Sequence, residues 1–235
     1  VYTVGETPEA ELRAEDVHLF SDGIEARICE GAEAAPLHLG IPGRFTVSNA
    51  LVALGIARQL GLSLQTAVAA LEPAKGVKGR VEVVPTPGKE FTVLIDYAHT
   101  PDGLEQLLRS VRDFCSGRLI AVFGCGGDRE RTKRRLMGSI AVNNADYVIV
   151  TSDNPRTEEP TAIIRDILEG VEGTTTPYAV EPDRRKAIRM ALRFAQKNDI
   201  VVLAGKGHET YQILGTRKTH LDEREEVARA LAETE

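Results

Sequence analysis

The sequence predicts an α/β fold in which helices cover both faces of a mostly parallel sheet. From residue 81 onward, short and continuous apolar runs recur at residues 91–95, 119–123, 147–150 and 200–204, with a weaker run at 178–180. Amphipathic helical patterns separate these runs, at residues 102–114, 131–143, 162–168 and 183–196. Apolar strands that alternate with amphipathic helices are typical of a doubly wound sheet that is buried on both sides.

The two ends of the chain carry different patterns. Residues 1–40 alternate apolar and polar positions around an Asp22-Gly23 turn, which predicts antiparallel strands. Two helices are expected after the Pro42-Gly43 break, at 49–60 and 64–71, and a hairpin and a last helix at 211–219 and 222–231. Pro73, Gly76 and Gly79 mark a linker. We therefore predict two domains, residues 1–78 and 79–235.

The composition is that of an ordinary globular protein, with 235 residues, 42% hydrophobic and 27% charged. A net charge of -6 gives no basic field for nucleic acid. The three cysteines match no zinc or disulfide pattern and are expected as free thiols in a reducing cytosol. Without a signal peptide or an apolar run of membrane length, we expect a soluble, cytoplasmic protein. We also expect a monomer. Because Val1 opens inside an expected strand, we expect a piece of a longer polypeptide.

Polar or glycine-rich segments follow four of the expected strands. They are residues 96–102, 124–129, 152–156 and 205–209. In parallel sheets, ligands bind outside the carboxyl ends of the strands. The four segments therefore outline one binding site on one rim of the sheet.

The segment Gly124–Arg129 is the least specific of the four. A glycine-rich turn lets backbone amides approach an anion, but this one is neither a Walker A sequence nor a dinucleotide fingerprint. A plain tight turn explains it equally well. Lys133, Arg134 and Arg135, further along, are expected to form a solvated helix face rather than a phosphate site.

The other segments carry more chemistry. In Asp153-Asn154-Pro155-Arg156 the proline stiffens the backbone, the amide donates and accepts, and the guanidinium offers a fork, which together suit a zwitterionic amino acid. The alternative is a turn with a surface arginine.

In Gly205–Glu209, Lys206 could meet a phosphate and Glu209 an ammonium, with His208 supporting them, unless this is a turn with exposed polar side chains. Asp96 stands where this fold class holds ribose hydroxyls. No metal site is expected, because no HExxH or CxxC pattern occurs.

Four strings taken together resemble one family. DYAHTPDGL at 96–104, FGCGGDR at 123–129, SDNPRTEEP at 152–160 and AGKGHE at 204–209 are similar, in order and spacing, to the last domain of the Mur ligases. PGRFTVSNALVALGIA at 42–57 resembles the segment that closes the family's central ATP domain, and Lys78-Gly79-Arg80 resembles the entry to the last domain. The resemblance implies a Rossmann-like carboxyl-terminal domain preceded by the end of an α/β ATP-binding domain.

Within that family the pattern is most similar to members that add meso-diaminopimelate. The resemblance implies that the amino acid is recognised by Asp153, Asn154, Pro155, Arg156, Arg129, Gly205 and Glu209. It implies that the adenosine of ATP is contacted by Asn49, Arg80 and Asp96, and we assign His99 to the same nucleotide side. Arg129 and Arg156 can pair with the distal carboxylate of diaminopimelate, whereas L-lysine would leave these guanidinium groups unpaired.

The resemblance also implies the reaction and its partners. With ATP and Mg²⁺, the γ-carboxyl of UDP-MurNAc-L-Ala-D-Glu becomes an acyl phosphate, which the amine of meso-diaminopimelate attacks. The family's phosphate-binding loop, its carbamylated lysine and its UDP-binding domain are absent from this sequence. We therefore expect no catalytic residue in this chain, no activity from it alone, and the amino-terminal part of the same enzyme as its partner. Rival hypotheses are a ligase that adds lysine, or glutamate to folate, and a non-catalytic amino-acid-binding α/β module.

Overall fold

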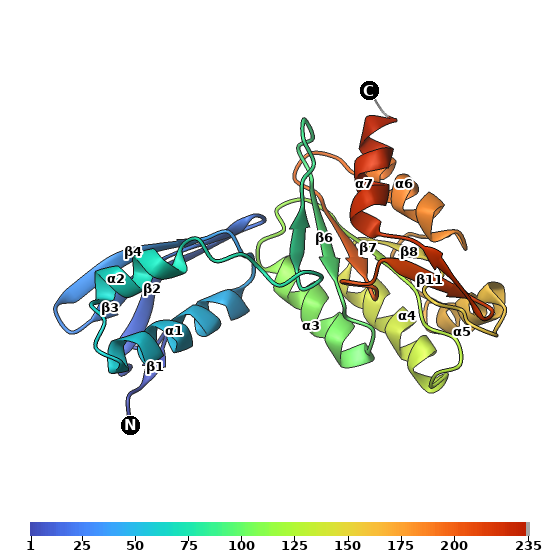
Figure 1. The fold of residues 1–235 in the computed structure, drawn as a ribbon. Helices are drawn as coiled ribbons and strands as arrows, with labels where there is room; N and C mark the ends of the chain where they lie inside the picture. Colours follow the sequence, from blue (N-terminus) through green and yellow to red (C-terminus); the bar gives the residue numbers. More distant parts are fainter. Residues whose placement is uncertain (234–235) are drawn as a thin grey trace. The chain divides into compact units, whose positions relative to one another are not determined.

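The computed structural model describes residues 1–233, and the chain divides between Gly76 and Val77 into two compact units (Figure 1). Each unit has a hydrophobic core of its own. The assignment of residues 1–78 and 79–235 to an ATP-binding and an amino-acid-binding domain stays a prediction.

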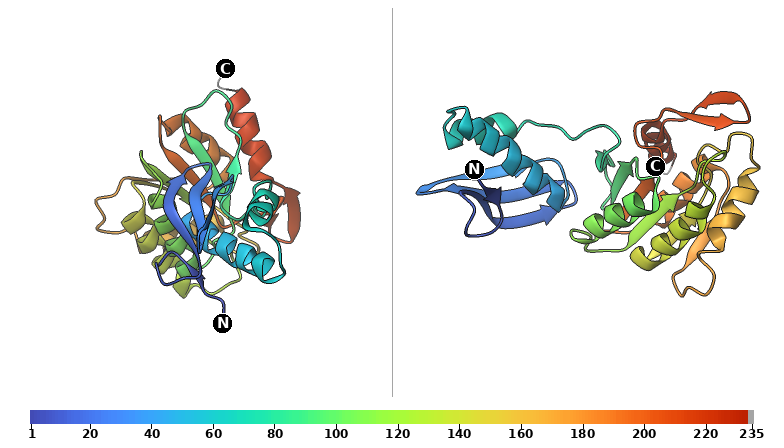
Figure 2. Two further views of the ribbon diagram at one scale, coloured as in Figure 1. Left: turned by 90° about the vertical axis from the view of Figure 1, so that its left-hand side faces the viewer. Right: turned by 90° about the horizontal axis from the view of Figure 1, so that it is seen from below.

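The first unit is a four-stranded sheet with two helices on one face (Figure 2). Its strands, in the spatial order β1-β2-β3-β4, are β1 (Val4–Gly5), β2 (Leu12–Phe20), β3 (Gly23–Glu30) and β4 (Glu33–Leu39). The antiparallel pairing of β2, β3 and β4 confirms the pattern predicted for residues 1–40. The helices are α1 (Arg44–Gln59) and α2 (Leu64–Leu71). α1 begins five residues before its predicted start, because its first turn already buries Thr46 and Val47.

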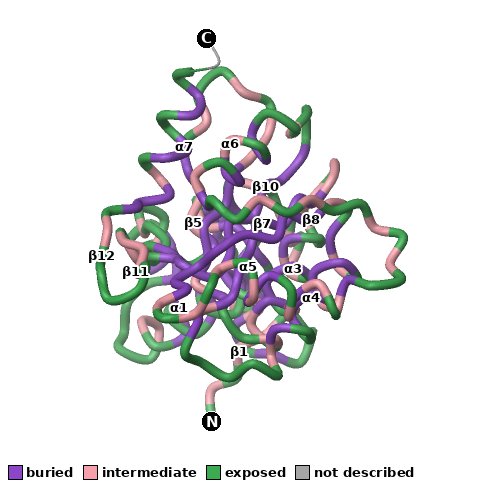
Figure 3. The backbone as a smooth tube through the Cα atoms, turned by 90° about the vertical axis from the view of Figure 1, so that its right-hand side faces the viewer, coloured by how far each residue is buried: buried purple, intermediate pink, exposed green. Residues whose placement is uncertain are grey.

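The second unit contains the predicted sheet, which has six strands in the order β5-β6-β10-β7-β8-β9. The strands are β5 (Glu82–Val84), β6 (Thr92–Asp96), β7 (Leu119–Phe123), β8 (Tyr147–Val150), β9 (Tyr178–Val180) and β10 (Ile200–Ala204). All pair in parallel except β5, which runs antiparallel to β6. β5 was not predicted, because a strand of three residues, two of them only partly buried, gives little periodicity. β7 and β10 are buried at every residue (Figure 3).

Helices cover both faces of this sheet, as predicted (Figure 1). They are α3 (Pro101–Arg112), α4 (Thr132–Asn144), α5 (Pro160–Leu168), α6 (Arg184–Phe194) and α7 (Glu223–Ala232). α3, α4 and α5 share one core with the sheet, and α6 and α7 share the other. The chain advances from β6 to β7, β8 and β9, then returns to place β10 between β6 and β7. Crossover connections between parallel strands are right-handed, so the helices of the advancing part and of the returning part of the chain lie on opposite faces of the sheet. A crevice opens at the carboxyl ends of the strands where the direction reverses, beside β10.

Side-chain caps fix where three of these helices start. Thr100 accepts a hydrogen bond from the amide of Gly103, Asp183 from the amides of Arg185 and Lys186, and Asp222 from that of Arg224. The cap at Asp183 was predicted. The predicted hairpin is also confirmed, as β11 (Tyr211–Leu214) and β12 (Arg217–His220), with Gly215 at a φ of 60°. None of the helices in residues 1–233 combines the length and the apolar character that crossing a bilayer requires.

Candidate functional site

A cavity of about 580 Å³ lies at the carboxyl ends of the parallel strands. The segments that follow β6, β7, β8 and β10 all contribute to its walls. The predicted site residues that line it are His99, Arg129, Asp153, Asn154, Arg156, Gly205 and Glu209. The fold therefore brings together predicted site residues that lie up to 110 positions apart in the sequence, from His99 to Glu209.

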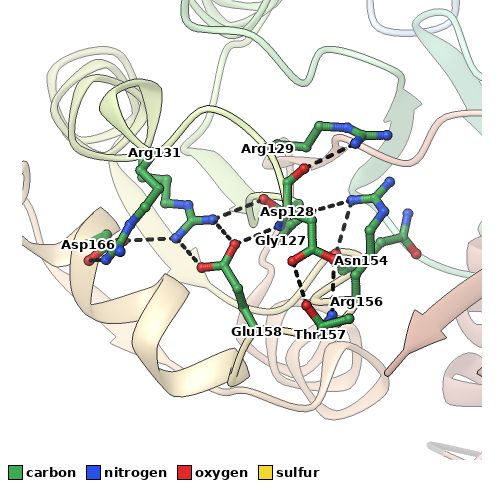
Figure 4. Close-up of polar contacts among 11 residues, drawn as sticks. Gly127, Asp128, Arg129, Arg131, Asn154, Arg156, Thr157, Glu158 and Asp166 are labelled. Atoms are coloured by element: carbon green, nitrogen blue, oxygen red, sulfur yellow. Dashed lines mark hydrogen bonds and ion pairs between the residues drawn. The ribbon is translucent and has the colours of Figure 1, made fainter. Parts of the chain in front are cut away.

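One wall of the cavity consists of two turns, one after β7 and one after β8, that are hydrogen-bonded to each other (Figure 4). The amide of Gly127 donates to the carbonyl of Asn154 at 2.9 Å, and a Cβ on Gly127 would lie 1.9 Å from the Pro155 carbonyl oxygen. Asp128, at a φ of 54°, accepts hydrogen bonds from the amide and hydroxyl of Thr157. Only glycine at 127 permits this approach, so the two turns form one rigid wall.

Two guanidinium groups belong to this wall. Arg156 donates its Nη1 to the carbonyls of Gly127 at 2.8 Å and Asn154 at 3.4 Å, and its own amide donates to Ile213. Arg129 donates its Nη1 to the carbonyl of Asp128 at 3.1 Å. Because both arginines also line the cavity, they form a cationic surface suited to a carboxylate.

Glu209 gives the cavity an anionic group. Its Oε2 accepts hydrogen bonds from Asn154 Nδ2 at 2.9 Å and from Lys206 Nζ at 3.0 Å, and Tyr211 donates to its Oε1 at 3.3 Å. Burial by itself raises the pKa of Glu209. The hydrogen bond from Asn154 and the charge of Lys206 more than offset burial and hold that pKa below its usual value. Glu209 is therefore ionised at neutral pH and can accept from an ammonium group.

The structure contradicts the expectation that Lys206 meets a phosphate. Its side chain is fully buried, with Nζ bonded to Glu209 and, at 3.3 Å, to Asn154 Oδ1. Gly205 and Gly207 have φ angles of 111° and 54°, which let the backbone turn the lysine inward. Lys206 therefore does not face the cavity, and its Nζ fixes the positions of Glu209 and Asn154, which line it.

Of the nucleotide-side residues predicted from the sequence, His99 lines this cavity, and Asn49, Arg80 and Asp96 are not among the lining residues. Both carboxylate oxygens of Asp96 accept backbone hydrogen bonds, from Val81 at 2.8 Å and Ala98 at 2.7 Å. Burial raises the pKa of Asp96, and these two amide hydrogen bonds offset only part of the effect. Arg80 stacks over the Tyr97 ring, with its Cζ 5.3 Å from the centroid.

Two further predicted residues, Asn49 and Pro155, are not among those that line the cavity. Asn49 lies on α1, in the first unit. Pro155 is buried behind the wall, where its carbonyl faces Gly127. Their roles, like those of the other predicted site residues, stay predictions.

The comparisons with known proteins agree with this fold. The model of the family described as "Mur ligase, glutamate ligase domain" matches residues 79–207, which is more than half of the chain. The chain belongs to the Mur ligase family.

Among curated relatives, this Mur ligase chain is 46% identical to a UDP-N-acetylmuramoyl-L-alanyl-D-glutamate--2,6-diaminopimelate ligase of Clostridium botulinum, over 98% of the chain and 48% of the relative. It is 48% identical to the ligase of the same name from Thermosynechococcus vestitus, over 99% of the chain and 47% of the relative. The chain thus spans about half the length of the curated relatives that it matches.

Solved structures of Mur ligases are also similar to this chain. A ligase of that name superposes with a TM-score of 0.80 at 37% identity, over 97% of this chain and 46% of the other. The UDP-N-acetylmuramate-alanine ligase of Thermotoga maritima superposes with a TM-score of 0.63 at 19% identity, over 99% of this chain and 47% of the other, which shows a shared fold only.

Some residues of this Mur ligase site were not predicted from the sequence. Tyr97 lines the cavity, with its ring centroid 4.6 Å from that of His99 and 5.2 Å from that of His208. Lys133 also lines the cavity and donates to the carbonyl of His99 at 2.8 Å. The position of Tyr97 directly after the strand-end aspartate was the signal that could have identified it.

The expectation that Arg134 lies on a solvated helix face is wrong. Its side chain is fully buried and bonds both carboxylate oxygens of Glu158, at 2.7 and 2.9 Å, and Asp166 at 2.8 Å. It shares the inward face of α4 with Met137, Gly138 and other core residues three to four positions apart. The hydrogen bond from Arg134, with a second one from the amide of Asp128, lowers the pKa of Glu158 to about 2.

Proposed function

We propose that this chain is the carboxyl-terminal part of an ATP-dependent ligase of peptidoglycan precursor synthesis. The ligase would join meso-diaminopimelate to the D-glutamate γ-carboxyl of UDP-MurNAc-L-Ala-D-Glu. The observation that carries the proposal is the pairing of two arginines, Arg129 and Arg156, with the ionised Glu209 in one cavity. This arrangement is complementary to the carboxylate and ammonium of one amino-acid group.

The distal end of meso-diaminopimelate fits this arrangement better than the distal end of L-lysine does. Diaminopimelate has a carboxylate and an ammonium at each end, whereas lysine has only an ammonium at its distal end. With lysine, the guanidinium groups of Arg129 and Arg156 would lose water without gaining a partner. A site built on such pairs rejects the ligand that lacks one of them by up to roughly 10⁴-fold.

The remaining polar groups of the cavity support this binding mode. Asn154 already donates to Glu209, and its Oδ1 accepts from Lys206 and from the amide of Ile213. The amide group is therefore fixed in orientation, and it holds the carboxylate of Glu209 for the ammonium. Holding one end of the amino acid in this way leaves the other amine for attack on the acyl phosphate.

ATP and Mg²⁺ are the cofactors of the proposed reaction. For the adenosine we propose Asn49, Arg80, Asp96 and His99. The stacked Arg80 and Tyr97 offer flat surfaces for a base, while Asp96 orders the backbone at Val81 beside them. Residues 1–233 contain no cluster of three or more His, Cys, Asp or Glu side chains that could hold a metal ion.

We further propose that the phosphate chemistry resides in the amino-terminal part of the same enzyme, and that the chain alone is inactive. The complete enzyme would act as a monomer in the cytoplasm. ATP-dependent ligation by the purified 235-residue chain would contradict both the inactivity of the chain and the placement of the phosphate chemistry outside it.

Calorimetric titration of the chain with meso-diaminopimelate tests the binding function, with L-lysine as the competing ligand. We expect binding of meso-diaminopimelate, no detectable binding of lysine, and at least a roughly tenfold loss of affinity in Arg156→Met. Arg131→Met is the matched control, because the Arg131 side chain is 68% exposed and lies outside the cavity. Equal or tighter binding of lysine would transfer the assignment to a lysine-adding ligase. A folded chain that binds neither ligand would refute an amino-acid site within this chain.

A further inference from the structure

A fully buried ion pair lies behind the cavity. Arg184, the first residue of α6, donates its Nε to Oε1 of Glu223, the first residue of α7, at 2.8 Å, and both side chains are 0% exposed. Removing two charges from water is costly, and an apolar pair of similar volume is often at least as stable. Packing alone therefore does not explain why a guanidinium occupies this position.

The other donors of Arg184 indicate its role. Its Nη2 donates to the carbonyl of Ala204 at 2.9 Å and its Nη1 to the carbonyl of Ser152 at 3.3 Å. Ala204 is the last residue of β10, and it directly precedes Gly205 of the cavity. Ser152 lies just past β8 and directly precedes Asp153 of the cavity.

No sheet hydrogen bonds connect these two strands, because β7 lies between β8 and β10. The segments that follow them nevertheless have to meet closely. A Cβ on Gly205 would lie 2.8 Å from Asp153 Oδ2, and Asn154 bonds Glu209 at 2.9 Å. A shift of one strand end relative to the other would separate the groups that form the two walls of the cavity.

We infer that Arg184, held in place by Glu223, is a positioning residue that sets the spacing of the two walls of the amino-acid cavity. It is not among the residues that line the cavity, so it acts through the backbone of Ser152 and Ala204. The inference rests on the proposed function for the identity of the ligand. The spacing that Arg184 imposes is a property of the unliganded chain.

A second arginine–carboxylate pair, in which the arginine side chain is 33% exposed, provides a control at the opposite end of the sheet. Arg118 donates to Asp199 Oδ2 from Nη2 at 2.6 Å and from Nε at 3.1 Å, and the Asp199 side chain is 3% exposed. These residues directly precede β7 and β10. This pair therefore joins two strands far from the cavity.

The test compares Arg184→Met/Glu223→Leu with Arg118→Met/Asp199→Asn in the full 235-residue chain. The first variant removes both buried charges and keeps apolar volume, so it should fold. Hydrogen exchange of the unliganded chain is followed at the amides of Gly205 and Gly127, which donate to the carbonyls of Asp96 and Asn154.

We expect at least a tenfold faster exchange at both amides in the Arg184→Met/Glu223→Leu variant, and a Kd for meso-diaminopimelate at least tenfold higher. The control variant should change neither quantity. Arg184→Lys serves as a milder variant, since lysine keeps the charge beside Glu223 but cannot span two carbonyls. It should weaken binding without a comparable loss in the unfolding temperature.

Wild-type exchange at both amides in the Arg184 variants would overturn the inference, whether or not a ligand binds. If the wild-type chain does not bind meso-diaminopimelate, the proposed function fails, and the exchange measurement still decides the role of Arg184. Faster exchange spread evenly over the whole unit would also overturn it, since that result indicates a general loss of stability.

Discussion

The replacement Arg134→Met tests how strongly the wall of the cavity is fastened to α4. Arg134 makes two hydrogen bonds to Glu158 and one to Asp166, all between 2.7 and 2.9 Å. Glu158 in turn accepts from the amide of Asp128, in the turn after β7 (Figure 4). Methionine fills similar space but removes the charge on which both carboxylates depend.

The structure sets the size of the expected effect. Breaking a buried ion pair from one side costs about 3–5 kcal/mol, because the remaining charge is left without its partner. The side chains of Glu158 and Asp166 are 25% and 20% exposed, so water can hydrate them in part. We therefore expect the lower end, about 3 kcal/mol. For a unit of this size that corresponds to a fall in the unfolding temperature of roughly 6–12 °C.

Tyrosine fluorescence during thermal unfolding can follow the relevant unit. The chain has no tryptophan, and four of its five tyrosines lie in the second unit, the exception being Tyr2. Arg131→Met is the control, because Arg131 bonds the same Asp166 from a side chain that is 68% exposed, and it should cost less than about 0.5 kcal/mol. Equal unfolding temperatures for Arg134→Met and Arg131→Met would refute the argument from burial.

Three further replacements have defined outcomes. Lys206→Met should raise the pKa of Glu209 measured by carbon NMR titration, because the charge of Lys206 helps to lower it. Gly127→Ala should lower stability by about 3 kcal/mol in urea unfolding, because its Cβ would lie 1.9 Å from the carbonyl oxygen of Pro155. Glu158→Gln should flatten the pH dependence of the unfolding temperature in acid. The wild-type contribution is present above the usual pKa of 4.5 and is lost as the pH falls towards about 2.

Each of these predictions has an outcome that would contradict it, and Gly127→Ala also has a comparison variant. Gly173 has a φ of 77° and open space around its Cβ position, so Gly173→Ala should cost only about 1 kcal/mol from backbone strain. A Gly127→Ala variant no less stable than Gly173→Ala would contradict the steric argument. An unchanged pKa of Glu209 in Lys206→Met would show that Lys206 does not hold that carboxylate. If the unfolding temperature of Glu158→Gln depends on pH in acid in the same way as that of the wild type does, the hydrogen bond from Arg134 does not lower the pKa of Glu158.

The sequence was sufficient to predict the parallel sheet, because its strands are buried on both faces and therefore consist of continuous apolar runs. β5 shows the limit of this argument, since a short edge strand with partly buried residues resembles a loop. The start of α1 was placed too late, because Gly43, with a φ of 100°, already ends the extended chain before Arg44. The insertion of β10 between β6 and β7 was also not predicted, because strand order depends on tertiary packing rather than on local pattern.

The sequence also predicted which strand ends meet, but not how the polar groups divide between the cavity and its support. Arg156 lines the cavity, while Arg134 and Lys206, which have the same charge, are buried behind it. Sequence patterns assign charged residues to the exposed positions of helices and strands, because Lys and Arg are almost never fully buried unless they are paired. The burial of these two cations therefore could not be predicted from their residue type. For Arg134, its spacing from the apolar residues of α4 was the signal. For Lys206 no local signal existed, because two glycines with positive φ decide its direction.

These buried cations explain how one sheet edge can hold a precise cavity. Arg134, Arg184 and Lys206 are among the largest fully buried side chains of the chain, and each stands behind segments that line the cavity. Each bonds a carboxylate on one side and loop atoms on the other, which apolar packing cannot do because it has no directional donors. Stability and site geometry should therefore be separable in this protein. Apolar replacement of a complete pair would keep the fold and lose the cavity, whereas removal of one partner would weaken both.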